Sequence, residues 1–340
     1  MKATTYDRYG GPDVLAVSDI PEPVPEPDQV LIDVDSASLN AWDWHQLRGE
    51  PRFMRLQTGL RVREPRTLGA DLAGTVAAVG TEVSGVVTGD RVLALVGHGA
   101  LAERAVARGG AMARISDDVP FDVAAATPMA GLTALQALRD SGRLAPGERV
   151  LVWGASGGVG HLAVQIAKVL GASRVDAVAS GRNAEMLTRL GADAVADYTK
   201  DESPEGPYDL IVDTVATASM RTLRGLLKDG GRVVTIGSVA GTGLLGPAAA
   251  LLRRVIAAAF LRMRHSGAIA KVAHGDLDQL STWLTDGRIA PVVRNAGSLE
   301  DVAGAVRELE DGHVAGKLSI AVAPGAVRTS TRSGAASAAD

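Results

Sequence analysis

The chain has 340 residues, 46% of them hydrophobic and 22% charged, and a formal net charge of −4 at pH 7. This length favours two domains over one, and the composition excludes a disordered chain and argues against nucleic acid as a partner. The chain contains no cysteine, which excludes disulfides, thiolate metal ligands and a cysteine nucleophile.

The N-terminal segment is strand-like and lacks the basic start and long apolar core of a secretory signal, so we expect a cytoplasmic protein. The longest apolar region, residues 244–263, is interrupted by Arg253, Arg254 and Arg262. These charges would be costly at the centre of a bilayer. We therefore expect no membrane span and no membrane partner.

Residues 1–121 consist of short β-type runs, such as 30–34, 74–79 and 91–95, separated by Gly, Pro and Asp. This pattern predicts a compact β domain. Segment 50–66 carries five arginines, which are Arg52, Arg55, Arg61, Arg63 and Arg66. The segment could be a solvated surface, or a steering patch for an acidic substrate or for the phosphates of a large thioester.

From Asp122 the pattern changes to strands that alternate with helices. The β-type runs occupy residues 149–153, 175–179, 194–197, 209–212 and 232–236, and the helical patterns occupy 160–170, 184–190 and 218–227. This alternation predicts an α/β domain with a doubly wound parallel sheet. Residues 248–263 are ambiguous, because Ala and Leu favour a helix whereas the position after the fifth strand favours an edge strand.

Two more helical patterns, at 276–284 and 299–309, precede a last strand at 317–322. Residues 324–340 are rich in Ala, Ser, Thr, Arg and Gly without apolar periodicity. This composition predicts a disordered tail.

A β-type run that ends at Trp153 passes through a glycine-rich turn into a helical pattern. Ala155, Gly157 and Gly160 occupy the three glycine positions of G-x-G-x-x-G, with alanine in the first. The second glycine lets a pyrophosphate approach the backbone, and the third lets the helix pack closely on the sheet. The residues expected to form this dinucleotide-binding turn are Ala155, Ser156, Gly157, Gly158, Val159 and Gly160.

The second strand of the nucleotide sheet is followed by Ser180, Gly181 and Arg182, with no acid at its carboxyl end. An acid there would recognise the ribose of NAD, whereas a basic residue suits the 2′-phosphate of NADP. Arg182 could form a forked ion pair with that phosphate, and Tyr198 after the third strand could join it. We therefore expect NADPH as the cofactor.

With these residues, the chain resembles a zinc-independent medium-chain dehydrogenase/reductase of the quinone oxidoreductase type. The matching blocks, besides the glycine-rich turn, are Asn40–Asp43, Leu68–Gly74 running to Gly80, Gly89–Val92, Ala100–Glu103, Gly131–Ala134 and Gly316–Lys317. Their order and spacing cover nearly everything before the tail.

The resemblance implies an α/β protein with a GroES-like β-barrel domain and a doubly wound Rossmann domain inserted into it. The GroES-like catalytic domain would comprise residues 1–122 with 268–323, and the NADP-binding Rossmann domain residues 123–267, followed by the tail 324–340. The sixth strand of the nucleotide sheet would fall near 254–261, and this apolar edge predicts a homodimer.

Zinc enzymes of this superfamily have a histidine and a glutamate after the glycine where this chain has Gly69-Ala70-Asp71. Ala70 cannot ligate a metal, and the cysteine ligands are missing, so we expect no metal site. The six histidines show no paired metal spacing, although His45 falls close to the expected site.

The resemblance places Asn40 and Asp43 on the cleft beside the nicotinamide. Asn40 could donate its amide to an oxyanion, and Asp43 could hold a ribose hydroxyl or relay a proton. Alternatively, both residues stabilise a turn. Trp42, Trp44 and His45 would line the substrate pocket, or the two tryptophans would be buried packing residues.

The resemblance adds further cofactor-binding residues at helix turns and strand ends, where such sheets bind ligands. They are Thr133, Asp213, Thr214, Gly237, Ser238 and Lys317. For Lys317, which matches the terminal Gly-Lys of the family, a surface position is the alternative.

We expect an NADPH-dependent reductase that transfers hydride to a small molecule, either a quinone or an α,β-unsaturated carbonyl, without zinc. One alternative is an enoyl-thioester reductase, which the basic segment would suit. Another is a non-catalytic NADPH-binding sensor or partner-binding module, against which the presence of Asn40 and Asp43 argues.

Overall fold

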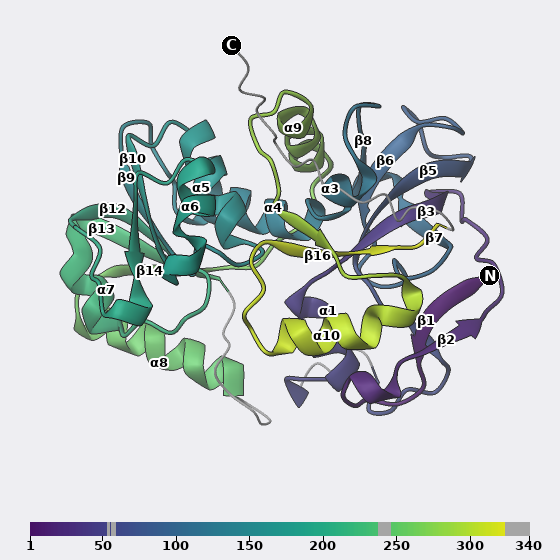
Figure 1. Ribbon diagram of the computed structural model, residues 1–340, viewed down its shortest axis with the longest axis horizontal. Coiled ribbons are helices and arrows are strands. Elements are labelled where there is room, and N and C mark those ends of the chain that lie inside the picture. Colours follow the sequence, from purple (N-terminus) through teal and green to yellow (C-terminus); the bar gives the residue numbers. More distant parts are fainter. Residues whose placement is uncertain (53–54, 56–58, 237–245, 324–340) are drawn as a thin grey trace, which may run out of the picture.

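The computed structural model describes residues 1–52, 55, 59–236 and 246–323, with the backbone alone for 246–252. One sheet has six parallel strands in the order β11-β10-β9-β12-β13-β14 (Figure 1). Its strands are β9 (Arg149–Trp153), β10 (Arg174–Ala179), β11 (Ala194–Asp197), β12 (Tyr208–Asp213), β13 (Leu227–Ile236) and β14 (Arg264–Ala268). Each of the five strands predicted between 149 and 236 lies within an observed strand, and the doubly wound sheet is confirmed.

Helices cover both faces of this sheet. They are α5 (Gly160–Val169), α6 (Ala184–Arg189), α7 (Met220–Leu226) and α8 (Gly246–Phe260). Successive residues of a strand point to opposite faces, so Val150 and Val152 join the core cluster that includes residues of α5, whereas Leu151 packs with Leu223 of α7 and Ala258 of α8. The sheet is therefore buried on both faces, as its continuous apolar strands require.

The second large sheet has the order β15-β16-β3-β5-β6-β8, with β7 paired on β3. Its strands are β3 (Gln29–Leu39), β5 (Asp71–Val79), β6 (Arg91–Leu95), β7 (Arg104–Arg108), β8 (Met112–Arg114), β15 (Val293–Asn295) and β16 (Lys317–Ala321). A small third sheet is formed by β1 (Lys2–Tyr6), β2 (Ala16–Asp19) and β4 (Arg66–Thr67). The last strand, β16, lies antiparallel to β3, so the end of the chain completes the GroES-like part, and Figure 1 shows this yellow strand beside purple β3.

The predicted position of the sixth nucleotide strand is wrong. Residues 254–261 lie largely in α8, and the sixth strand is β14, which pairs in parallel with β13. The alanine-rich run forms the helix that its intrinsic propensity favours. Its position after the fifth strand was the weaker predictor of its structure. The helix contacts β14 and lies beneath the sheet in the view of Figure 1.

Further helices lie in the GroES-like part or between it and the nucleotide sheet. They are α1 (Ala41–Arg48), α3 (Phe121–Ala125), α4 (Pro128–Gln136), α9 (His274–Thr285) and α10 (Val302–Glu310). Helix α4 packs against both α5 and α9, and α1 packs against α10. The guanidinium of Arg48 donates to both oxygens of Glu310 at 2.6 and 2.8 Å, which fixes α1 to α10. The helix that follows Asn40 is thereby held in one orientation.

Candidate functional site

Asn40 stands between the end of β3 and the first turn of α1. The Oδ2 atom of Asp43 accepts the backbone N–H of Asn40 at 2.6 Å, so Asp43 satisfies a donor at the start of the helix. The turn-stabilising role that the sequence left open for Asp43 is therefore present. Asp43 is only 1% exposed.

The side-chain amide of Asn40 is held between two buried charged groups. Its Nδ2 donates to Oδ2 of Asp71 at 2.9 Å, and its Oδ1 accepts a hydrogen bond from Nζ of Lys317. Lys317 also donates to the carbonyl of Leu39 at 2.7 Å and lies 3.9 Å from Asp71. The surface position considered for Lys317 is wrong, because the residue is 3% exposed.

Asp71 begins β5 and is fully buried. Its two carboxylate oxygens accept the backbone N–H of Met129 in the first turn of α4, at 3.1 and 3.2 Å. The positive end of the helix dipole therefore adds to Lys317 in stabilising the carboxylate. Sequence reasoning missed Asp71 as a site residue, although it lies in one of the blocks that carry the resemblance.

We call Asn40, Asp43, Asp71 and Lys317 the buried charge cluster. Burial raises the pKa of Asp71 to about 6, against the opposing effects of Lys317, the Asn40 amide and the Met129 N–H. Burial also raises the pKa of Asp43 to about 7, and burial lowers the pKa of Lys317 against the attraction of both carboxylates. The two carboxyls thus hold their protons to a higher pH than an exposed aspartate does.

Asn40 is the member of the cluster that lines a large cleft of about 1410 Å³. Trp42 and His45 of α1 line the same cleft, and Met129, Thr133 and Val159 line it on the nucleotide side. Apolar residues after β14 complete this wall, including Ala268, Ile269, Ala270 and Val272. The cleft thus adjoins both the amide of Asn40 and the glycine-rich turn, as expected for a hydride-transfer site.

The three predicted pocket residues of α1 have different environments. The indole N–H of Trp42 donates to the carbonyl of Gly97 at 3.1 Å, which holds the ring at the cleft. Trp44 stacks on His45 at a centroid distance of 3.7 Å and packs against the core of the GroES-like part, as in the packing alternative. Burial lowers the pKa of His45.

The glycine-rich turn has the shape that a dinucleotide requires. A Cβ added at Gly160 would lie 2.3 Å from the carbonyl oxygen of Gly154, so only glycine allows α5 to pack this closely. A Cβ at Gly157 would have that oxygen as its sole neighbour within 4 Å, at 3.6 Å, so the backbone there is open to a ligand. The residues fit a pyrophosphate at the N-terminus of α5.

The same turn contacts the segment that precedes β16. The N–H of Gly316 donates to the carbonyl of Ser156 at 2.8 Å, and a Cβ at Gly158 would lie 3.1 Å from Cδ of Lys317. His161 is fully buried next to the turn, and its Nδ1 lies 2.9 Å from the carbonyl oxygen of Gly157. Burial lowers the pKa of His161 to about 4, so this imidazole is neutral at physiological pH.

The expected 2′-phosphate residues gather at the ends of β10 and β11. Arg182 is exposed and donates to the carbonyl of His313 at 3.1 Å, and Tyr198 is 55% exposed. Ser180 accepts a hydrogen bond from Asn183 at 3.2 Å. An acid that the sequence analysis overlooked, Asp197, ends the neighbouring strand β11.

The carboxylate of Asp197 is already engaged by its own loop. It accepts the N–H and the hydroxyl of Thr199 at 3.0 and 2.7 Å and also the N–H of Gly181, and these hydrogen bonds hold its pKa below the usual range. A Cβ at Gly181 would lie 2.3 Å from Oδ2 of Asp197, so the glycine is needed to accommodate this carboxylate.

The strand-end residues Asp213 and Thr214 have structural partners. Asp213 is fully buried and pairs with Arg254 of α8 at 2.5 Å, and Thr214 donates to the carbonyl of Trp153 at 2.9 Å. Thr133 donates to the carbonyl of Met129 at 2.6 Å while lining the cleft. The predicted residues Gly237 and Ser238 and the tail 324–340 lie outside the described residues.

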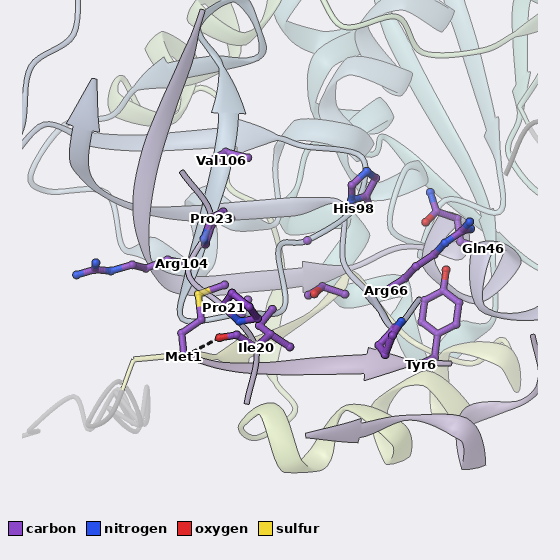
Figure 2. Close-up of a pocket in the computed structure, with 15 residues that line it drawn as sticks. Met1, Tyr6, Ile20, Pro21, Pro23, Gln46, Arg66, His98, Arg104 and Val106 are labelled. Atoms are coloured by element: carbon purple, nitrogen blue, oxygen red, sulfur yellow. Dashed lines mark hydrogen bonds between the residues drawn. The ribbon is translucent and has the colours of Figure 1, made fainter. Parts of the chain in front are cut away.

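None of the five arginines of segment 50–66 lines the cleft. Arg55 donates to the carbonyls of Arg48 and Gly49 and stacks on Tyr9, so it stabilises the end of α1. Arg66 lines a second cavity of about 580 Å³, in which Figure 2 shows it beside Tyr6 and below His98. The five arginines are therefore not part of the wall of the cleft that contains Asn40.

The chain matches the alcohol dehydrogenase GroES-like domain over residues 26–117 and the zinc-binding dehydrogenase family over residues 190–320. It is 34% identical over 336 residues to a 2-methylene-furan-3-one reductase of Solanum lycopersicum, with 94% of this chain and 79% of the relative covered. The identity is 33%, with the same coverage, to a chloroplastic NADPH-dependent alkenal/one oxidoreductase of Arabidopsis thaliana. The solved quinone oxidoreductase from Coxiella burnetii superposes with a TM-score of 0.82 at 30% identity, covering 95% of this chain and 99% of that chain.

A GroES-like barrel combined with a nucleotide sheet of this strand order defines a medium-chain dehydrogenase/reductase. The chain belongs to the quinone oxidoreductase-like members of that family, which are nicotinamide-dependent oxidoreductases. The resemblance inferred from the sequence is thereby confirmed. Among the described residues, no group of three metal-ligating side chains comes together, and no helix has the length and apolarity to cross a membrane.

Proposed function

We propose that this protein is an NADPH-dependent reductase that transfers hydride to quinones or α,β-unsaturated carbonyls without zinc. The observation that carries the proposal is Asn40, whose amide lines the cleft while Asp71 and Lys317 fix its orientation. The names of the relatives agree with this substrate class, because they include an alkenal/one oxidoreductase and quinone oxidoreductases.

When bound, the reduced nicotinamide supplies the hydride. The chain's own contribution is to position the acceptor and to stabilise the negative charge that develops on its oxygen. One N–H of the Asn40 amide is used by Asp71, which leaves the second to donate to that oxygen. Conjugation in a quinone or enone delocalises the remaining charge, so a strong Lewis acid is not needed.

Metal independence rests on the chemistry of the residues at this wall. Ala70 stands where zinc enzymes of the superfamily have a histidine, and the chain has no cysteine. The neighbouring carboxylate of Asp71 is occupied by Asn40, Lys317 and the N–H of Met129. We therefore propose that the buried charge cluster acts where a metal ion acts in the zinc enzymes.

The preference for NADPH rests on the exposed guanidinium of Arg182 and on the engaged state of Asp197. Arg182 is free to turn toward a 2′-phosphate at the loss of one hydrogen bond to His313. Asp197 ends the neighbouring strand β11, not β10, and its carboxylate already accepts hydrogen bonds from Thr199 and Gly181, so we propose that it does not replace the ribose-binding acid of NAD enzymes.

The test is consumption of NADPH with a panel of benzoquinones, enones, aldehydes and enoyl thioesters, each with and without a chelator. We expect turnover with the first two classes, unaffected by the chelator. NADPH binding without turnover of any acceptor would favour the sensor hypothesis. Turnover of thioesters alone would favour the enoyl-thioester reductase, and loss of activity on chelation with recovery on adding zinc would contradict metal independence.

We also propose a homodimer. The sequence argument relied on an apolar edge strand at 254–261, whereas the structure has α8 there and β14 at the edge of the sheet. β14 is one of the two edge strands of the nucleotide sheet, and α8 beside it exposes Val255, Ile256 and Phe260. Pairing of two β14 edges would satisfy backbone donors and cover this apolar surface. Sedimentation that shows only monomer at micromolar concentration would contradict the proposal.

A further inference from the structure

Lys317 connects two parts of the site that come from distant segments of the chain. Just before it, the backbone N–H of Gly316 donates to the carbonyl of Ser156 in the glycine-rich turn. The backbone N–H of Lys317 itself donates to the carbonyl of Val292 at 2.9 Å. Its aliphatic stem passes Gly158, where a Cβ would lie 3.1 Å from Cδ. Its ammonium then reaches Leu39 and Asn40 in the GroES-like part.

The backbone at this point allows no alternative path. Gly316 has a φ of +69°, and a Cβ there would lie 2.2 Å from the carbonyl oxygen of Val292. Only glycine adopts this conformation in this space without displacing its neighbours. The start of Lys317 is therefore fixed relative to the dinucleotide turn.

We propose that Lys317 is a positioning residue that fixes the carboxamide of Asn40 relative to the dinucleotide turn. This inference rests on the proposed reductase function. Lys317 itself does not line the cleft, so it acts through Asn40. The residue was expected from the sequence to contact the cofactor, and the geometry gives it a different task.

Two features of the contacts support this role. The ammonium at Oδ1 and the carboxylate at Nδ2 distinguish the two ends of the Asn40 amide, so the amide adopts one of its two flip states. A cation at the carbonyl end also polarises the amide and strengthens its remaining N–H as a donor. Both effects are lost when the ammonium is removed.

Removal of the ammonium also changes the titration of the cluster. Lys317 lowers the pKa of Asp71 and of Asp43, so both values rise when the cation is gone. The charged or titratable groups that face Lys317 are Asp71 on β5, Asp43 on α1 and the neutral His161 on α5. In the pH dependence of kcat, the pH below which the rate falls as these carboxyls become protonated is therefore expected to be higher in such a variant.

The experiment compares K317M, which keeps the stem and removes the charge, with K228M as a matched control. Lys228 is a surface lysine that pairs with Asp209 at 3.0 Å. With NADPH and 1,4-benzoquinone, we expect kcat of K317M to fall about 10- to 100-fold, with KM and the NADPH Kd within about threefold. K228M should match the wild type in all three constants.

A second readout does not depend on turnover. Hydrogen exchange of the Asn40 side-chain amide, followed by NMR and assigned with an N40S variant, should be about tenfold faster or more in K317M and unchanged in K228M. If the wild type turns over no acceptor, the proposed function fails while this measurement still tests the role of Lys317. Wild-type exchange and an unshifted pH profile in K317M would overturn the inference.

The outcome for cofactor binding is equally decisive. A rise in the NADPH Kd by the same factor as the fall in kcat would mean that Lys317 serves the dinucleotide turn alone, and would overturn the proposal. If K317M does not fold, the neutral pair D71N/K317M takes its place, because it leaves no unpaired lysine or aspartate at these two positions. Because D71N by itself changes a partner of Asn40, this variant is compared with D71N: a lower kcat and faster amide exchange than in D71N support the proposal, and values equal to those of D71N contradict it.

Discussion

The two walls of the cleft hold their polar groups in opposite ways. On the GroES-like side, Asp71 and Lys317 are 0% and 3% exposed, and every contact to Asn40 is made in a dry environment. On the nucleotide side, the turn at Gly157 offers backbone groups, and Arg182 stands in solvent. We therefore expect a single substitution in the first wall to lower the stability of the protein strongly. In the second wall, we expect substitution or added salt to lower the affinity for the cofactor in smaller steps.

The strongest way to break this comparison is to remove one charge of the buried pair. Asp71→Ala leaves Lys317 with only the more distant Asp43 as counter-charge, and we expect the free energy of unfolding to fall by about 3 to 5 kcal/mol. Urea denaturation measures this value. The control is Glu185→Ala, which removes a surface pair with Arg189 and should cause no measurable change. Equal effects of the two substitutions would show that the buried cluster is not special.

The second prediction separates rate from stability at the same wall. Asn40→Ala removes the donor that faces the cleft, and we expect kcat to fall about 10²- to 10³-fold. The NADPH Kd should change little, because the dinucleotide turn is untouched. The control, Gln46→Ala, lies on the same helix and loses a hydrogen bond to Gly97, and it should keep the wild-type rate. A normal kcat in the Asn40 variant would remove the residue from the mechanism.

The third prediction concerns the exposed wall. Arg182→Ala should weaken NADPH binding about tenfold to a hundredfold, because a hydrogen bond to a charged group contributes about 1.5 to 3 kcal/mol. NADH lacks the 2′-phosphate and should be unaffected. The difference between the two cofactors should also shrink as salt rises. Fluorescence titration of both cofactors measures these constants, and equal losses would mean that Arg182 only supports its loop.

The last prediction concerns the pH dependence that Asp71 gives to folding. Burial raises its pKa in the folded protein from 3.8 to about 6, so between these values the folded state binds the proton more tightly than the unfolded chain. This carboxyl therefore contributes stability at low pH that is lost as pH rises from about 4 to about 6, by about 3 kcal/mol at about 1.4 kcal/mol for each pKa unit.

The measurement is the change in unfolding free energy between about pH 4.5 and about pH 6.5, compared between the wild type and Asp71→Asn. The variant cannot titrate at this position, so its change in unfolding free energy should be more favourable at the higher pH by about 2 kcal/mol. An identical pH dependence in the two proteins would show that Asp71 has an ordinary pKa.

The nucleotide wall was largely predictable from the sequence, and the GroES-like wall was not. Glycines at 157 and 160 lie within a few residues of the strand and helix that they join, so local pattern identified their role. Asp71 and Lys317 meet only because β16 joins the sheet of β3 and β5, and no local pattern carries that information. The burial of Lys317 therefore depends on contacts between distant segments, which the sequence around Lys317 does not reveal.

Two further differences have local explanations. Residues 254–261 were placed on a strand by analogy with the fold, although their alanine content favours the helix that the structure shows. Asp197 is not evident from the sequence, because a ribose-binding acid is expected at the end of the preceding strand, whereas parallel pairing places Asp197 beside Ala179. The first outcome follows from the composition of the segment itself, and the second from the neighbouring strand.

The position of β16 has a consequence for the synthesis of this protein. Asp71 leaves the ribosome early, whereas Lys317 follows only after the whole nucleotide sheet has been translated. The strand that completes the GroES-like part is thus among the last to emerge. Until then, the barrel is incomplete and the carboxylate of Asp71 lacks the ammonium of Lys317. A nascent or truncated chain that lacks residue 317 should therefore keep this half open and exposed to chaperones and proteases.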